Sequence, residues 1–143
     1  MPDTPRIDFY VVRDGSADAH FRCACRIVEK AYEQGMRAHI YTQDEADTQR
    51  MDDLLWTFRD GSFIPHERQS QEQVLCPITL NHAWCPQQSE LLINLTAAVP
   101  ELYKNFERIA EIVGASATQI QNGRQRFRFY KEQGLEPQYH EVN

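Results

Sequence analysis

Short apolar runs and longer helical repeats alternate along this chain. Residues 7–12 are β-rich and mostly apolar, as the interior strands of a sheet are. In the next stretch Phe21, Cys25 and Val28 recur at spacings of four and three, which predicts an amphipathic helix. Gly35 follows that pattern at the position where helices commonly end. The chain therefore opens with a predicted strand and helix.

Residues that cap helices precede each helical segment. Ser16 or Asp18 can cap the first helix, because their side-chain oxygens accept hydrogen bonds from free backbone N–H groups. Residues 42–45, Thr-Gln-Asp-Glu, have the spacing of a capping box and predict the start of a second helix. Ser116 predicts the start of a last helix, which ends at Gly134.

The remaining short runs predict further strands. These strands are expected at residues 37–41, 63–65, within 74–80, and 91–95. The polar residues 67–73 are expected to form a loop. Pro100 suits the start of a helix of one or two turns over residues 101–106. Residues 108–113 fit either a helix or a strand, and periodicity does not decide between them.

Strands that alternate with helices predict the fold class. We expect a single α/β domain with a mostly parallel or mixed central sheet and helices on both faces, which is a Rossmann-like arrangement. A length of 143 residues fits one domain, residues 1–143. We expect its core to span about residues 6–134, and residues 135–143, with Pro137, to form a loose tail.

Composition restricts the kinds of function. The hydrophobic content of 41% and the charged content of 25% are typical of a soluble globular protein. No apolar run approaches the roughly 20 residues that span a membrane, and residues 1–6 carry no apolar signal region. We therefore expect a cytoplasmic protein without a membrane partner. The net charge of −6 argues against general duplex-DNA binding, which needs excess positive charge.

The cysteines do not predict disulfides or a metal site. They are Cys23, Cys25, Cys76 and Cys85. A reducing compartment keeps thiols free, and residues two apart on a helix, such as Cys23 and Cys25, point to different faces. His82 and Cys85 have the spacing of metal ligands, but no second pair accompanies them. We therefore expect buried or unused thiols and no bound metal.

Nucleotide-binding and catalytic motifs are absent from the sequence. None of the six glycines belongs to GxGxxG or GxxxxGK(S/T), and the turn at residues 13–16 has too few glycines to cradle a phosphate. No G-x-S-x-G elbow is present. The adjacent carboxylates at residues 44–45 and 52–53 fit exposed charge, and His66 fits a structural or interfacial role. We therefore expect no nucleotide-binding loop, no cofactor and no catalytic residue.

An aromatic cluster spans the end of the second helix and the strand after it. Trp56 and Phe58 end the predicted helix, and Phe63 and Ile64 begin the predicted strand. Pro65 cannot donate to a sheet ladder, so this strand is expected at a sheet edge or to end there. Aromatic side chains near a sheet edge can form a protein-docking surface. The alternative is that Trp56 and Phe63 belong to the core.

The last helix is basic and aromatic, unlike the rest of the chain. Residues 122–133 carry four cations and one anion. Arg124, Phe127, Arg128 and Lys131 follow an i, i+3, i+4, i+7 spacing and therefore share one face. Guanidinium groups beside an aromatic ring suit an acidic peptide with a hydrophobic end. Three alternatives stay open: favourable charge at the helix C-terminus, a solvated basic face, and binding of single-stranded DNA.

The segment Leu-Trp-Thr-Phe at residues 55–58, followed by Ser-Phe-Ile-Pro-His at residues 62–66, resembles a signature of the chi subunit of bacterial DNA polymerase III holoenzyme. Three further segments agree with that family in order and spacing: Ile-Asp-Phe-Tyr at 7–10, Glu-Leu-Leu-Ile-Asn-Leu at 90–95, and Arg-Gln-Arg-Phe-Arg-Phe-Tyr-Lys at 124–131. The resemblance covers about residues 7–134 and favours a strand over 108–113.

This resemblance implies a non-catalytic adaptor of the clamp-loader complex. In the family, the last helix binds the acidic, Phe-ended C-terminal tail of single-stranded DNA-binding protein. Arg124, Phe127 and Arg128 fall on the positions that carry this contact. Phe127 stands where Tyr is common and Arg128 where Lys is known, and both changes keep the ring or the charge. We add Lys131 and Val113 to the expected site.

The resemblance also implies a second interface. It puts Trp56 and Phe63 on the surface that binds the psi subunit of the clamp loader or an alternative helicase partner. Phe58, Ile64 and Pro65 are included as neighbours in the motif. Such an adaptor would tether the replisome to coated single-stranded DNA and contact nucleic acid only indirectly.

Two other functions stay open from the sequence. A direct single-stranded DNA-binding protein would bind a bare oligonucleotide as tightly as it binds an acidic peptide. A small hydrolase would need an acidic pocket near Asp14 or Asp44 and would turn over nucleotide or peptide substrates.

Overall fold

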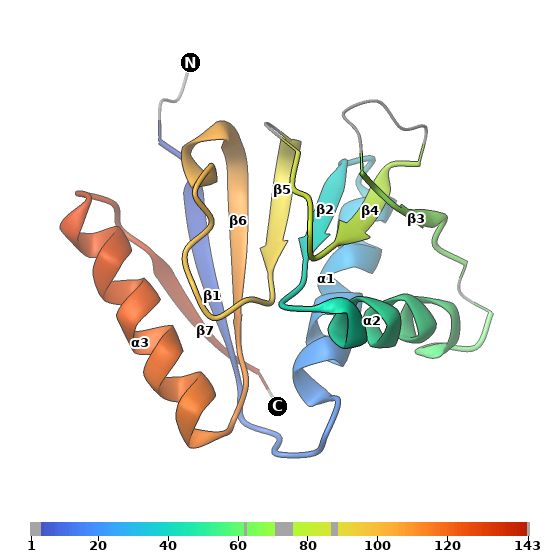
Figure 1. The fold of residues 1–143 in the computed structure, drawn as a ribbon, viewed down its shortest axis with the longest axis horizontal. Helices are drawn as coiled ribbons and strands as arrows, with labels where there is room; N and C mark the ends of the chain where they lie inside the picture. The colour runs from blue at the N-terminus through green and yellow to red at the C-terminus, as the bar shows by residue number, and fades with distance from the viewer. Residues whose placement is uncertain (1–3, 62, 71–75, 87–88, 143) are drawn as a thin grey trace.

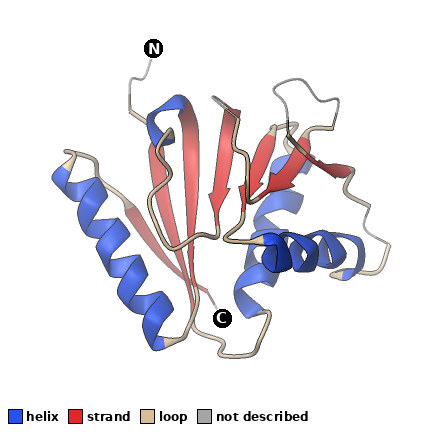
Figure 2. Cartoon of the chain, in the orientation of Figure 1, coloured by secondary structure: helices blue, strands red, loops and turns tan. Residues whose placement is uncertain are grey.

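The computed structural model describes residues 4–61, 63–70, 76–86 and 89–142, which form one seven-stranded sheet with helices packed on it (Figures 1 and 2). The strands are β1 (Arg6–Val12), β2 (Ala38–Tyr41), β3 (His66–Arg68), β4 (Ile78–Asn81), β5 (Ser89–Asn94), β6 (Phe106–Val113) and β7 (Gln138–Val142). Their order in the sheet is β3-β4-β2-β5-β6-β1-β7, and every pairing between described strands is parallel.

Helices cover both faces of this sheet. The helices are α1 (Ala19–Glu33), α2 (Glu45–Thr57) and α3 (Ala117–Glu132), with a short 3-10 turn, η1 (Tyr103–Asn105). In Figure 1, α3 lies at the side of β7 and β1, and α1 and α2 lie toward β2 and β4. The α1 and α2 face buries a core that includes Val28, Ile40 and Met51. The α3 face buries a second core that includes Phe9 and Tyr130.

The continuous apolar run of β5 shows why the sheet needs helices on both sides. Leu91 and Ile93 point into the α1 and α2 core, and Leu92 between them points into the α3 core. Neighbouring side chains of a strand point to opposite faces, so an apolar run without alternation must be covered twice. The predicted α/β class with helices on both faces is therefore confirmed.

Several predicted elements are confirmed in place. The strand over 7–12 is β1, and residues 108–113 belong to a strand, β6, as the resemblance favours. Gly35 follows α1 with a φ of 74°, a left-handed conformation that suits glycine and stops the helix. The last helix begins after Ser116 and ends before Gly134, as the sequence predicts.

The predicted loose tail is wrong. Residues 138–142 form β7, which pairs with β1 from Asp8–Gln138 to Val12–Val142. Without β7 the backbone groups of β1 would be unpaired along that edge, so the tail satisfies them. Pro137 lies just before the first paired residue, where its missing N–H breaks no ladder hydrogen bond.

The strand predicted over 63–65 is displaced. The paired residues are His66–Arg68, which lie partly in the segment predicted as a loop. Pro65 immediately precedes the ladder, consistent with its inability to donate to it. The expectation that this segment lies at a sheet edge is confirmed, because β3 is the outermost strand beside β4. Of the strand predicted within 74–80, residues 74–75 lie outside the described part of the chain and 78–80 belong to β4.

Local details at three helix starts also differ from the predictions. Asp44, and not Thr42, caps α2, with its carboxylate accepting from the Asp47 N–H at 2.9 Å. Asp18 holds the cap position of α1, but its carboxylate binds Arg50 in place of a backbone N–H. The helix expected over 101–106 is only the turn η1, because Phe106 already begins β6.

Candidate functional site

Helix α3 is fixed at its start by a capping box. The Ser116 hydroxyl accepts from the Gln119 N–H at 3.1 Å, and the Gln119 side-chain oxygen accepts from the Ser116 N–H at 3.2 Å. These two bonds satisfy backbone donors that would otherwise have no partner at a helix start. The helix therefore begins at a defined residue, which sets where its later side chains fall.

A buried polar network fixes the rotation of α3 about its own axis. The carboxylate of Glu111 on β6 accepts from Arg126 Nε at 2.8 Å, from the Tyr130 hydroxyl at 2.6 Å and from the amide of Asn94 at 2.9 Å. Burial raises the pKa of Glu111, and the Arg126 charge and the donated hydrogen bonds oppose that shift. Arg126 is therefore an anchor of α3 on the sheet and not part of an exposed basic surface.

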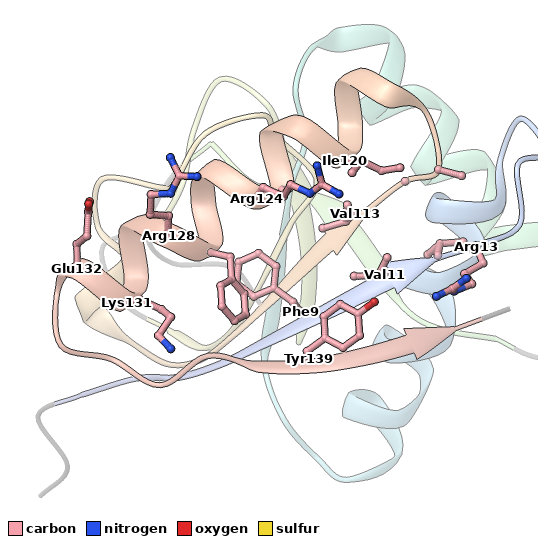
Figure 3. Close-up of a pocket in the computed structure, with 15 residues that line it drawn as sticks. Phe9, Val11, Arg13, Val113, Ile120, Arg124, Arg128, Lys131, Glu132 and Tyr139 are labelled. Atoms are coloured by element: carbon pink, nitrogen blue, oxygen red, sulfur yellow. The ribbon is translucent and has the colours of Figure 1, made fainter.

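With that face turned inward, the opposite face of α3 borders a groove of about 1000 Å³. The groove runs between α3 and the strands β6, β1 and β7, and Figure 3 shows the side chains that project into it from both sides. All five residues predicted for the peptide site line it: Val113, Arg124, Phe127, Arg128 and Lys131.

The groove has an apolar floor and a cationic rim. Phe9, Val11 and Val113 come from neighbouring strands, and Phe127 packs edge-on against Phe9 with ring centroids 5.2 Å apart. Arg124, Arg128 and Lys131 are exposed along α3, above this floor. An apolar slot beside exposed cations suits a ligand that combines carboxylates with a hydrophobic side chain.

The sequence did not predict the far side of the groove. Phe9, Val11 and Arg13 follow a strand spacing of two, so their side chains share the face that α3 covers. That spacing was visible in the sequence, but nothing marked this strand as a neighbour of α3. Tyr139 also lines the groove, and it was missed because its segment was predicted to be a loose tail.

The second candidate site is the aromatic surface, formed by Trp56 and Phe63. Their side chains are 51% and 65% exposed, and their ring centroids lie 5.6 Å apart. The alternative in which both residues belong to the core is therefore wrong. Two large exposed aromatic rings in contact are typical of a surface that another protein covers.

His66 supports the aromatic surface from below. Its ring lies 4.4 Å from that of Trp56, its Nε2 lies 2.7 Å from Asp52 Oδ1, and its Nδ1 lies 2.7 Å from the Ile64 carbonyl oxygen. The side chain is almost fully buried, so it holds Trp56 in place and a structural role fits it.

Three predicted neighbours of this surface take different positions. Ile64 is 1% exposed and belongs to the core beside α1 and α2, so it cannot contact a partner directly, which corrects its predicted place. Phe58 is partly buried against the same core, and Pro65 is half-buried. Buried Ile64 anchors the segment that carries the exposed ring of Phe63.

Other candidate chemistry is sparse in the described part of the chain. No group of three or more His, Cys, Asp or Glu side chains there is placed to hold a metal ion. None of the four cysteines, all of which are described, forms a disulfide, and burial raises the pKa of Cys25 to about 12, which keeps that thiol protonated and unreactive. No helix among the described residues is long and apolar enough to cross a membrane.

Comparison with known proteins identifies close similarities. The protein-family model described as DNA polymerase III chi subunit, HolC, matches residues 4–138. The chain is 40% identical over 138 residues to the DNA polymerase III subunit chi of Pseudomonas aeruginosa, covering 96% of each chain. It is 25% identical to the corresponding subunits of Haemophilus influenzae, over 88% of this chain and 90% of that one, and of Escherichia coli, over 78% of each.

Proposed function

Because the chain belongs to the DNA polymerase III chi subunit family and so has an accessory role in replication, we propose that it is a non-catalytic adaptor with two protein-binding sites. One site is the groove, which takes the acidic C-terminal tail of single-stranded DNA-binding protein. The other is the aromatic surface, which takes the psi subunit or a helicase. Bound at both sites, the adaptor tethers the polymerase machinery to coated single-stranded DNA.

The observation that carries the groove assignment is a cationic rim on an acidic protein. The chain has a net charge of −6, yet Arg124, Arg128 and Lys131 gather along one groove with an apolar floor. A terminal phenyl ring fits between Phe127 and Val113, and the acidic groups of the tail fit the rim. Contacts of this kind weaken as salt screens exposed charges.

Two local contacts support the absence of catalysis. The Asp14 carboxylate accepts from the Ser16 N–H at 2.8 Å, and the Asp44 carboxylate caps α2. Both carboxylates of the alternative hydrolase site therefore have turn or cap roles. We expect the purified protein to hydrolyse neither nucleotides nor peptides.

Calorimetric titration with a short acidic peptide that ends in Pro-Phe tests the groove assignment. We expect micromolar affinity, about −8 kcal/mol, that weakens between low and moderate salt. The variant Arg128→Ala should lose about 1.5–3 kcal/mol, the range for a charge-assisted hydrogen bond. Arg22→Ala is the matched control, because Arg22 is an exposed arginine on α1, away from the groove. Equal affinity of the Arg128→Ala variant and the wild type would remove the assignment.

Direct binding of single-stranded DNA is the second candidate, since arginines and an aromatic ring share the groove. A fluorescently labelled oligothymidine distinguishes the two candidates by anisotropy. We expect the oligonucleotide to bind far more weakly than the peptide, because the surrounding field of the protein is negative. Equal affinities would favour the nucleic acid.

A further inference from the structure

The groove has a fourth cation, which lies on the side opposite α3. Arg13 follows the end of β1 and lines the groove together with Tyr139 of β7 (Figure 3). Its backbone N–H donates to the Val142 carbonyl at 2.9 Å, which continues the β1–β7 ladder and fixes where the side chain begins. An incoming peptide on α3 therefore has a guanidinium on each side of it.

Unlike Arg124, Arg128 and Lys131 on the groove side of α3, Arg13 already has a carboxylate partner. Its Nη2 lies 2.6 Å from Oε1 of Glu141, and the Tyr139 hydroxyl donates to the same oxygen at 3.1 Å. Among the described residues, Arg124, Arg128 and Lys131 form no salt bridge. The chain thus supplies its own acidic group to one cation of the groove.

A carboxylate of a bound peptide can replace Glu141 in the ion pair with Arg13. The side chains of Arg13 and Glu141 are 64% and 49% exposed, and ion pairs between exposed groups contribute little to stability. The Glu141 carboxylate takes an N–H of Arg13 Nη2, and a carboxylate of a bound peptide can take that same donor in its place. Glu141 can turn toward solvent without leaving a buried charge behind.

We propose that Glu141 is a built-in competitor for Arg13, so that an acidic peptide in the groove gains the full charge of its fourth cation only by displacing the Glu141 carboxylate. The inference rests on the proposed function, because it specifies how the same groove selects its peptide. Peptides with a carboxylate that reaches from α3 to Arg13 displace Glu141, and shorter or less acidic peptides do not. Glu141 thereby lowers the affinity for the longer acidic peptides that reach Arg13, affects the shorter ones little, and so narrows the difference in affinity between them.

A double-mutant cycle with the acidic Pro-Phe peptide tests this inference by calorimetry. Glu141→Gln should tighten binding about two- to fivefold, and Arg13→Gln should weaken it by a similar factor. In the Arg13→Gln background the added Glu141→Gln change should have little effect on affinity, because the guanidinium for which Glu141 and the peptide compete is absent. Melting temperatures of all variants check that β7 remains folded.

Two further variants separate competition from general charge. Glu132→Gln removes an acidic group that also lines the groove and has no salt bridge among the described residues. Its effect should be equal in the wild-type and Arg13→Gln backgrounds. Glu141→Asp keeps the charge but withdraws the carboxylate from Arg13, and it should tighten binding in part.

These measurements distinguish failure of the Glu141 competition from failure of the peptide-binding groove itself. Peptide binding by the wild type with a Glu141→Gln effect that is the same in both backgrounds would overturn the competition and leave the groove assignment standing. A wild type that binds no peptide at all would overturn both. Tighter binding that depends on Arg13 supports the inference.

Discussion

Trp56 and Phe63 carry large exposed rings, and each is next in sequence to a side chain that is buried in the core, Leu55 or Ile64. Exposure and anchoring are divided between neighbouring residues, since Phe63 is 65% exposed and Ile64 is 1% exposed. Removing an exposed ring costs little folding energy, whereas removing a buried side chain leaves a cavity. Substitutions at the two positions should therefore separate binding from stability.

We predict that Trp56→Ala changes the free energy of unfolding by less than about 1 kcal/mol but weakens psi binding by about 2 kcal/mol or more, as loss of an aromatic hot spot does. Ile64→Ala should instead cost about 2–5 kcal/mol of stability. Urea denaturation and calorimetry with the psi subunit measure the two quantities. Unchanged psi affinity in Trp56→Ala would remove that residue from the interface.

His39 is a buried titratable residue in β2 that belongs to neither candidate site. Its Nδ1 lies 2.8 Å from the Thr79 hydroxyl and its Nε2 lies 3.2 Å from the Trp84 carbonyl oxygen. A carbonyl only accepts, so Nε2 donates and the ring is neutral with Nδ1 accepting from Thr79. Burial lowers the pKa of His39 to about 4.

The lowered pKa predicts a loss of stability in mild acid. The unfolded chain binds a proton at His39 below about pH 6.5, but the folded protein does so only near pH 4. The free energy of unfolding should therefore fall by roughly 3 kcal/mol as the pH drops from 6.5 to 4. Urea denaturation across this range measures it, and His39→Gln should flatten the slope. Equal slopes in the two proteins would contradict the prediction.

At the scale of elements, α3 approaches β6 closely at Gly123. A Cβ added there would lie 2.8 Å from both γ carbons of Val113, so α3 could not keep its present distance from the sheet. Both residues line the groove, and its width thus depends on the absence of one side chain. Gly→Ala in an open helix usually stabilises by about 1 kcal/mol, and here the close contact opposes that gain.

We predict that the clash exceeds the gain in helix propensity. Gly123→Ala should lower the free energy of unfolding by about 1–3 kcal/mol, the usual cost of overpacking, and should also weaken peptide binding. Gln125→Ala, at an exposed position of the same helix, is the control and should be nearly neutral in both measurements. A Gly123→Ala protein that is more stable than the wild type would show that β6 and α3 separate easily.

The elements differ in how far the sequence determined them. Local signals were sufficient for β1, which is a mostly apolar run, and for α1 and α3, where a helical pattern and a closing glycine agree. They failed for β7, since Tyr139 and its neighbours form a strand only because β1 needs a partner on that edge. They also failed near Pro65, where pairing with β4 selects His66–Arg68 over the more apolar residues before it.

The candidate sites were likewise predictable where they depend on one element and not where they depend on how elements pack together. The helix face of Arg124, Phe127, Arg128 and Lys131 was predictable, because it depends on periodicity within one element. Residues across the groove were not predictable, because they depend on which strands lie next to α3. The burial of Ile64 was missed because Ile64 was included as a neighbour of Phe63 in the motif, although the exposed Phe63 and the buried Ile64 alternate as neighbours in a strand do.

At the scale of the whole molecule, the two candidate sites lie toward opposite edges of the sheet. The aromatic surface adjoins β3, the outermost strand on one side, and the groove reaches β7, the outermost strand on the other (Figure 1). The seven strands between them form one parallel sheet. No shared side chain links the two sites among the residues described for each.

We predict that the two sites bind independently. The dissociation constant of the acidic peptide should change less than about twofold when the chain is saturated with psi subunit, since sites without shared contacts act additively. Calorimetric titration of the preformed complex measures this, with Trp56→Ala as a variant that should leave peptide affinity unchanged. A larger shift would reveal coupling through the sheet.

The two sites also differ in how far apart along the chain their residues lie. The aromatic surface is built within residues 52–66, whereas the groove joins residues 9–13, 113–132 and 139. Contacts between distant segments form late, because closing long loops costs entropy before the contacts are made. We therefore expect a folding chain to complete the aromatic surface before the groove. Binding of an acidic tail in the groove would then show that the whole sheet has formed.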